Sequence, residues 1–372
     1  MDCRQRVLKT IKLELPDRPP LDGWFLKSVL DELKNHFKVS TTVDVFKNLG
    51  IDFLPTCMLP GKNFRKDASY FSKMGASIQI ADYFVRKYSD DELEDEWGVR
   101  IKITGKEDLD WKYSYHPLNN GGKLSIDNLK LPNLKDKGRF DKVKRDIEKY
   151  KDKYIIVAGS TTLFRKGWIL CGFSRFLEAL YTDRAFVDKL LDILIEYIIE
   201  EVNIYIKEGV DIIQFGGDLG TEKSLMISPS LWREIFKPRF KKIIDETKKE
   251  EVHFYLHSDG NIQPIIPDLI EIGINILNPI QPECMDPTKI KQKYGDKITL
   301  HGTMSLQKTF AQGGKEDIKN EVFSRIRECG YNGGLILSPS NAFTKDIHID
   351  NILFFYKLVG QINLHNSMKK FK

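Results

Sequence analysis

The sequence predicts an α/β protein built as a closed (β/α)8 barrel, a TIM barrel, with an irregular N-terminal excursion. Apolar, β-branched runs alternate with stretches of helical period along the second half of the chain. Together with three runs further upstream they give about eight strands, and strand–helix–strand repeats produce parallel strands joined by crossover helices. No G-x-G-x-x-G motif follows any of these runs, which disfavours an open dinucleotide-binding sheet.

The expected strands and helices follow from this alternation. The strands lie at residues 20–22, 51–54, 154–158, 211–215, 252–257, 274–278, 298–301 and 335–338. The clearest helices lie at 186–207, 229–249, 262–272, 316–329 and 350–362. Ser228 is a suitable helix cap and Pro229 a suitable first helical residue. Gly209, Gly273 and Gly330 fall where helices should end.

Residues 60–150 interrupt the alternation. They contain Asp-Glu-Trp-Gly at 95–98 and Asn-Asn-Gly-Gly at 119–122, which indicates an irregular excursion or a small hairpin within a single domain spanning 1–372. Residues 130–153 are rich in Lys and Arg, but acidic residues are interleaved with them. A solvated helix surface is therefore favoured over a basic docking face.

Composition excludes several classes of protein. With 372 residues, 41% of them hydrophobic, the chain can fill a large core. A net charge of +5 from 58 basic and 53 acidic residues is too small a surplus to indicate nucleic-acid binding. The chain has no stretch long and apolar enough for a membrane span and no apolar signal segment near Met1. The five scattered cysteines indicate neither a disulfide framework nor a zinc finger. We therefore expect a cytoplasmic protein that binds neither nucleic acid nor a membrane.

Polar side chains follow five consecutive expected strands. A TIM barrel carries its active site at the carboxyl ends of its strands, so these side chains should line one cleft. The expected catalytic residues are His257, Asp218 and His301. The expected substrate-binding residues are Asp22, Gln214, Asn278, Gln281 and Asn341.

The sharpest motif is the His257-x-Asp259 pair. Residues two apart on an extended segment point to the same side, so the imidazole and the carboxylate can converge on one metal ion or one proton. These ligand types suit Zn²⁺. We expect His257, Asp259 and Glu222 as zinc ligands, with Asp218 or His301 as alternatives for the third position. The alternative is that Asp259 only begins a turn and His257 only donates a hydrogen bond in the core.

Segments spread almost from end to end resemble the uroporphyrinogen decarboxylase superfamily, specifically its cobalamin-linked (corrinoid) methyltransferase-like branch. The most specific segments are ISPSLWR at 227–233, HSDGNI at 257–262, LNPIQP at 277–282 and GLILSPSN at 334–341. The resemblance implies a TIM barrel with a funnel-shaped site.

Two departures from the family pattern direct the functional hypothesis. Uroporphyrinogen decarboxylases resemble one another in an Arg-bearing N-terminal loop, but residues 20–27 contain no Arg and one Asp, which argues against binding a substrate with many carboxylates. Thiol-alkylating methyltransferases of the branch hold zinc with His-x-Cys, and Asp259 stands where the Cys would be. A harder, more electrophilic zinc would suit activation of an ether oxygen.

The leading hypothesis is a corrinoid-dependent, zinc-dependent methyltransferase of the O-demethylase type. It would demethylate a small methoxylated or methylated compound and pass the methyl group to a Co(I) corrinoid carried by a partner protein. Two alternatives stay open: a decarboxylase of the uroporphyrinogen type, and a non-catalytic protein that binds a corrinoid or tetrapyrrole. A homodimer also stays open.

Overall fold

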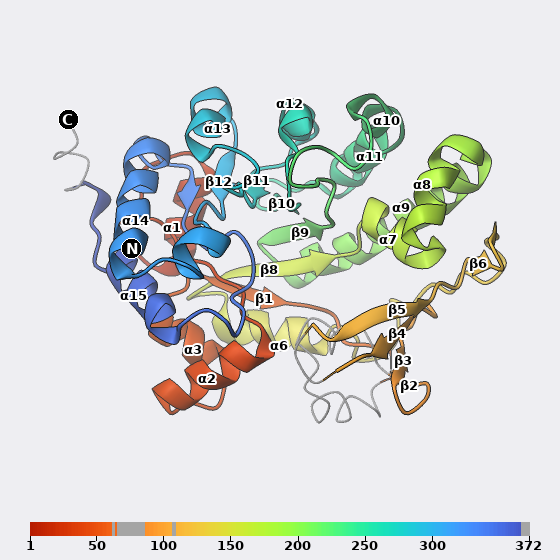
Figure 1. Ribbon diagram of the computed structural model, residues 1–372, viewed down its shortest axis with the longest axis horizontal. Helices are drawn as coiled ribbons and strands as arrows, with labels where there is room; N and C mark the ends of the chain where they lie inside the picture. Colours follow the sequence, from red (N-terminus) through yellow and green to blue (C-terminus); the bar gives the residue numbers. More distant parts are fainter. Residues whose placement is uncertain (62–63, 65–85, 106–108, 366–372) are drawn as a thin grey trace.

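The barrel wall is a seven-stranded parallel sheet with the order β1-β8-β9-β10-β11-β12-β13. The computed structural model describes residues 1–61, 64, 86–105 and 109–365. In Figure 1 the sheet is curled, with its helices on the outside. The strands are β1 (Phe53–Thr56), β8 (Ile155–Ser160), β9 (Ile212–Gly216), β10 (His253–His257), β11 (Ile276–Asn278), β12 (Thr299–His301) and β13 (Leu335–Ile336).

The expected first strand is reduced to a single bridge that closes the barrel. Leu21 pairs in parallel with Leu337, just after β13. The Leu337 N–H donates to the Pro20 carbonyl at 2.9 Å, and the Asp22 N–H donates to the Leu337 carbonyl at 3.2 Å. On the other side of this segment, the Asp52 N–H donates to the Leu21 carbonyl at 2.8 Å. The segment therefore lies between β13 and β1, and the predicted TIM barrel is confirmed.

The crossover helices lie where the sequence predicts them, with two local differences. The helix expected at 229–249 is divided at Phe236 into two, and Pro238 lies in the first turn of the second, where a missing N–H costs no helical hydrogen bond. The helix expected at 262–272 begins as a 3₁₀ turn, η2 (Gln263–Ile265). The helices are α1 (Cys3–Ile11), α2 (Lys27–Phe37), α3 (Thr42–Leu49), α7 (Leu163–Cys171), α8 (Phe173–Thr182), α9 (Arg184–Glu208), α10 (Pro229–Ile235), α11 (Lys237–Thr247), α12 (Ile266–Ile272), α13 (Pro287–Tyr294), α14 (Lys315–Cys329) and α15 (Ile349–Gly360), with a π-helical turn η3 (Leu306–Phe310).

The excursion is more regular than the sequence predicts where the structure describes it. Four antiparallel strands form a separate sheet, and a two-stranded hairpin follows. The elements are β2 (Arg86–Lys87), β3 (Glu92–Glu94), β4 (Arg100–Ile103), β5 (Trp111–Tyr115), β6 (Asn119–Asn120), β7 (Lys123–Leu124) and the helix α6 (Asp141–Tyr150). Residues 62–63, 65–85 and 106–108 of the expected excursion lie outside the described residues. The basic stretch at 130–153 includes α6, whose one buried residue is Val143, as expected of a solvated helix.

The Asp-Glu-Trp-Gly segment at 95–98 attaches the small sheet to the barrel. Asp95 accepts hydrogen bonds from the backbone N–H groups of Trp97 and Val99 at 3.0 and 2.8 Å. Glu96 forms an ion pair of 2.6 Å with the buried Arg139. Trp97 packs edge-on against Tyr197 of α9, with ring centroids 4.9 Å apart. These contacts place β2–β5 beside the helices that follow β8 (Figure 1).

Helix α1 lies across the amino-terminal end of the barrel strands. It begins at a capping box formed by Asp2 and Gln5. Its Arg4 pairs at 2.9 Å with Asp211, just before β9. The carbonyl of its Thr10 accepts a hydrogen bond of 3.3 Å from Thr299, the first residue of β12. Helix α1 thus contacts the beginnings of two strands, β9 and β12, that lie far from it and from each other in the sequence.

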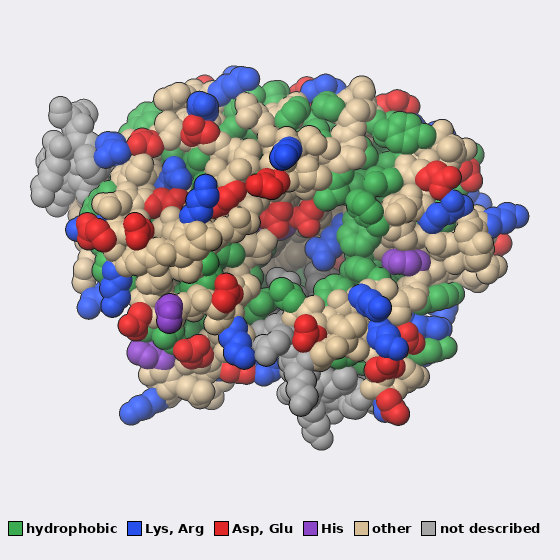
Figure 2. All heavy atoms as spheres, in the orientation of Figure 1, with side chains coloured by type: hydrophobic (Ala, Val, Ile, Leu, Met, Phe, Trp, Pro, Cys, Tyr) green, Lys and Arg blue, Asp and Glu red, His purple; other side chains and the backbone are tan. Residues whose placement is uncertain are grey.

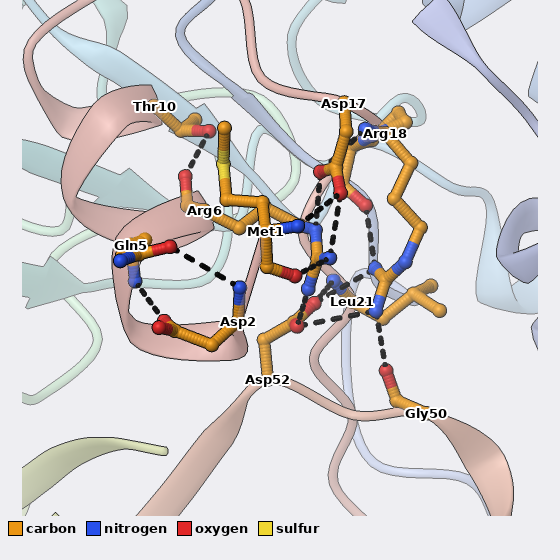
Figure 3. A network of polar contacts seen from close by, with 11 residues as sticks. Met1, Asp2, Gln5, Arg6, Thr10, Asp17, Arg18, Leu21, Gly50 and Asp52 are labelled. Carbon is orange, nitrogen blue, oxygen red and sulfur yellow. Dashed lines mark hydrogen bonds and ion pairs between the residues drawn. The ribbon is translucent and has the colours of Figure 1, made fainter. Parts of the chain in front are cut away.

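Asp52, just before β1, is the centre of the polar network in Figure 3. Its buried carboxylate pairs with Arg6 at 2.6 Å and with Arg18 at 2.8 Å. It also accepts the Leu21 N–H at 2.8 Å, so the same side chain supports the closing seam of the barrel. Arg6 makes a further ion pair of 2.7 Å with Asp17.

None of the helices among the described residues is both long enough and apolar enough to cross a membrane. The expected cytoplasmic location stays a prediction.

Candidate active site

The strand register brings the predicted residues to one level at the carboxyl end of the sheet. His257, the last residue of β10, is paired with Gly216 of β9 and with Asn278 of β11. The next pairing along the sheet aligns Leu277 with Leu300, so Asn278 lies level with His301. Parallel pairing is the physical reason that residues 20 to 40 positions apart in the chain meet here.

Asp218, His257 and Asp259 form a compact group. One possible ligand atom from each lies within 4.8 Å of the others. The Nε2 atom of His257 is 3.8 Å from Oδ1 of Asp218, and the same oxygen accepts the Asp259 N–H at 3.1 Å. The loop after β9 and the loop after β10 are therefore held together by the carboxylate of Asp218.

Two neighbouring side chains, Asn278 and Trp24, orient the ring of His257. Its Nδ1 donates to Oδ1 of Asn278 at 2.7 Å, and its Nε2 faces Asp218. The indole of Trp24 lies against the imidazole, with ring centroids 4.7 Å apart. These two neighbours determine which nitrogen can bind a metal ion or accept a proton.

Asp259 is a half-buried carboxylate whose Oδ1 atom is buried. Burial raises its pKa, and the charge of Asp218 raises it further, against the opposite influence of His257, Asn341 and Arg165. Its Oδ2 accepts a hydrogen bond of 2.6 Å from Asn341. Its Oδ1 is buried without a hydrogen-bond partner among the described residues. A buried, unpartnered carboxylate oxygen is costly unless a cation or donor meets it.

His301 lies in a narrow pocket beside this group. Its side chain is 1% exposed, and its Nε2 is 3.3 Å from Oδ2 of Asp22. The rings of Phe53 and Tyr255 flank it, at centroid distances of 5.6 and 5.3 Å. The pocket is lined by Asp22, Gly23, Trp24, Asn278, His301, Ser338, Pro339, Ser340 and Asn341.

The remaining predicted residues are more peripheral. Glu222, expected as a zinc ligand, is exposed, and the carboxylate that lies with His257 and Asp259 is that of Asp218. Gln281 accepts the backbone N–H of Gly260 at 3.2 Å, which holds the turn after Asp259. Gln214 is half-buried on β9, paired with Tyr255.

Three residues at this end of the barrel were missed by the sequence reasoning. Tyr255 precedes His257 by two residues on the same strand, so strand periodicity could have indicated it. Trp24 follows the short closing segment, and nothing in its spacing indicates a contact with His257. Arg165 lies on α7, the helix that follows β8, and its charge lowers the pKa of Asp259.

The described surface is hollowed near the middle of the face in Figure 2. Acidic and basic side chains lie on the wall of this hollow, and hydrophobic side chains lie beside it. A mixed polar wall of this kind suits a small polar ligand better than an apolar one.

Comparisons with known proteins agree with this architecture. The chain is similar over 97% of its length to a methyltransferase from Methanosarcina mazei, with 18% identity, 99% of that chain covered and a TM-score of 0.69. It is also similar to a B12-independent methionine synthase from Shewanella sp. W3-18-1, with 10% identity, coverage of 97% and 98%, and a TM-score of 0.50. At these identities the likeness shows the fold. No curated protein sequence matches the chain.

The family model for uroporphyrinogen decarboxylase (URO-D) matches residues 125–362, which include β8 to β13 and every member of the Asp218–His257–Asp259 group. The chain therefore belongs to the uroporphyrinogen decarboxylase family.

Proposed function

We propose that the protein is a corrinoid-dependent methyltransferase. It demethylates a small methoxylated or methylated compound and passes the methyl group to the Co(I) corrinoid of a partner protein. The single observation that carries this proposal is the Asp218–His257–Asp259 group at the carboxyl end of the barrel. The likeness in fold to a methyltransferase over nearly the whole of both chains supports it.

The three side chains fit a zinc ion. They offer one imidazole nitrogen and two carboxylate groups, a ligand set that zinc accepts in catalytic sites with a further position left for substrate. Asn278 orients the imidazole from the far side, as outer hydrogen-bond partners of zinc ligands do. The Oδ1 atom of Asp259, which has no hydrogen-bond partner among the described residues, is the atom of the group that most needs a cation beside it. Zinc held there would supply a Lewis acid that polarises the ether oxygen.

The chain's own residues orient the groups around that position. His257, held by Asn278, would present Nε2 to the metal beside the carboxylate of Asp218, which lies 3.8 Å from it. Trp24 covers one side of the imidazole and limits the access of water from that side.

The pocket chemistry argues against a porphyrinogen substrate. Its lining residues include Asp22 but neither Lys nor Arg. Lys27, the one cation of the stretch that carries Arg in the decarboxylases, pairs at 2.5 Å with Asp31 on the surface of α2. Neither the narrow pocket nor Lys27 therefore offers a guanidinium group to a substrate carboxylate, and Arg165, near Asp259, is one bidentate partner where a porphyrinogen needs several.

Incubation with a reduced corrinoid tests the proposal. Purified protein supplied with Zn²⁺ and cob(I)alamin, as a stand-in for the partner's cofactor, is mixed with a panel of methyl ethers, and the cobalt absorption spectrum is followed. We expect loss of the Co(I) spectrum with at least one methyl ether and none with the matching demethylated compound. Conversion of uroporphyrinogen to a product with fewer carboxyl groups, or no methyl transfer from any ether, would overturn it.

A further inference from the structure

Three buried polar atoms lie beside the Asp218–His257–Asp259 group: Nδ1 and Nε2 of His301 and the hydroxyl of Tyr255. None of them has a hydrogen-bond partner among the residues that the structure describes, although Nε2 of His301 lies 3.3 Å from the carboxylate of Asp22. His301 and Tyr255 are both 1% exposed. Buried polar atoms without hydrogen bonds destabilise a fold, so their concentration here indicates a site that a polar ligand group completes.

The surroundings define the chemistry of that group. Oδ2 of Asp22 lies 3.3 Å from Nε2 of His301, and the charge of Asp22 also acts on the Tyr255 hydroxyl. The site thus offers a carboxylate acceptor together with imidazole and phenol groups that can donate. The pocket that contains His301 has room for about one water-sized group, so the ligand inserts a single small group and not a ring.

Several common groups each fail to match these features. A carboxylate would be repelled by Asp22, and an ammonium group could not accept a hydrogen bond from His301 or Tyr255. An alkyl group would leave all the polar atoms unpaired. A hydroxyl can donate to Asp22 and accept from His301 or Tyr255 at the same time.

We propose that His301, Tyr255 and Asp22 form a hydroxyl-binding subsite that selects the methyl donor. The inference rests on the proposed function and makes it more specific: the substrate class is a methyl ether that also carries a free hydroxyl group. Trp24 and Asn278 line the pocket, and both contact His257. The ligand therefore extends from the subsite along Trp24 to the Asp218–His257–Asp259 group.

Equilibrium binding tests the subsite without metal, corrinoid or turnover. The affinities of the purified protein for 2-, 3- and 4-methoxyphenol and for methoxybenzene are measured by isothermal titration calorimetry. We expect at least one methoxyphenol to bind ~10-fold or more tightly than methoxybenzene, because a lost hydrogen bond at a buried polar site costs about 1.4 kcal/mol or more.

Tyr255→Phe removes the hydroxyl and keeps the ring, and it should abolish most of the preference for methoxyphenols over methoxybenzene. Tyr197→Phe is the matched control, because the Tyr197 hydroxyl is also buried without a hydrogen-bond partner among the described residues but lies on α9, away from the pocket. Asp22→Asn is a second variant, which keeps the size of the side chain and should also reduce the preference.

Equal affinities for methoxyphenols and methoxybenzene, or no measurable binding of any methoxyphenol, would overturn the subsite. An undiminished preference in both Tyr255→Phe and Asp22→Asn would overturn it as well. Selective binding combined with no methyl transfer would instead contradict the proposed function and leave the subsite standing.

Discussion

The two ends of the barrel hold their buried charges in opposite ways. At the amino-terminal end, the carboxylate of Asp52 is met by two guanidinium groups and a backbone N–H (Figure 3). The carboxylate of Asp211 is met by Arg4. At the carboxyl end, Asp259 and His301 keep buried polar atoms without hydrogen-bond partners among the described residues. The first end satisfies its polar atoms within the chain, and we propose that a ligand satisfies those of the second end.

The pKa values show the same difference. Burial opposes ionisation of Asp17 at the amino-terminal end, but the hydrogen bonds and the charge of Arg6 outweigh it and lower the pKa to about 2. Burial raises the pKa of Asp259 at the other end, where the nearest carboxylate, Asp218, adds to the shift. Stabilising ion pairs are therefore concentrated at the first end, and we propose that the second end is the one used for binding.

The largest expected effect is on stability, at the amino-terminal end. Asp52→Ala removes the shared partner of Arg6 and Arg18 and the acceptor of the Leu21 N–H. Arg6 keeps its pair with Asp17, but Arg18 loses its carboxylate partner and the buried Leu21 N–H loses its acceptor, so the free energy of unfolding, measured by urea unfolding, should fall by about 3 kcal/mol. Asp245→Ala, which breaks an exposed pair on α11, is the control and should cost at most ~0.5 kcal/mol. Similar losses in the two variants would contradict the comparison.

The second effect is on activity, at the carboxyl end. His257→Ala removes the imidazole that presents Nε2 to the ligand, and methyl transfer should fall by at least ~10²-fold. Zinc content should fall with it, while urea unfolding should change less than in Asp52→Ala. The exposed His36 on α2 supplies the control variant, His36→Ala. Wild-type zinc content in His257→Ala would show that this histidine is not a ligand.

The third effect is on zinc affinity and compares two residues at opposite ends of one strand segment. Asn278→Ala removes the hydrogen bond that orients His257, and zinc affinity should fall by about 10–100-fold, measured by competition with a chelator. Asn275, at the other end of the same strand segment, accepts the Phe254 N–H at 2.8 Å. Asn275→Ala should therefore lower stability and leave zinc affinity unchanged. Equal zinc affinities in the two variants would contradict the assignment of Asn278.

The smallest effect is the contribution of Asp17 to acid stability. Its folded pKa of about 2 lies below the ordinary value of 3.8, so the folded state binds fewer protons than the unfolded state between these pH values. The stability that Asp17 contributes is present above about pH 4 and is lost as the pH falls towards about 2. Asp17→Asn should therefore flatten the decline in unfolding free energy over this window. An unchanged decline, followed by urea unfolding at a series of pH values, would show that other groups control it.

Local sequence patterns predicted most of the fold, because strand and helix periodicities depend on neighbouring residues. The strands at β1 and β8–β13 and the helix α9 lie within a few residues of their expected ranges. The division of one predicted helix at Phe236 was not predicted, because apolar periodicity continues across this residue. The ordered sheet β2–β5 was not predicted either, because the periodicity of its sequence is weak.

For the candidate site, the sequence alone was enough to predict that polar and ligand-forming side chains lie at the carboxyl end of the barrel. Side chains that follow parallel strands must meet, so His257, Asn278 and His301 could be expected together. Only the tertiary structure decided that Asp218, and not Glu222, lies with His257 and Asp259, since this depends on the path of the loop after β9. The same holds for Trp24, which reaches His257 because the closing segment of the barrel lies next to β13. Contacts between distant segments depend on how the barrel closes, and no local pattern encodes them.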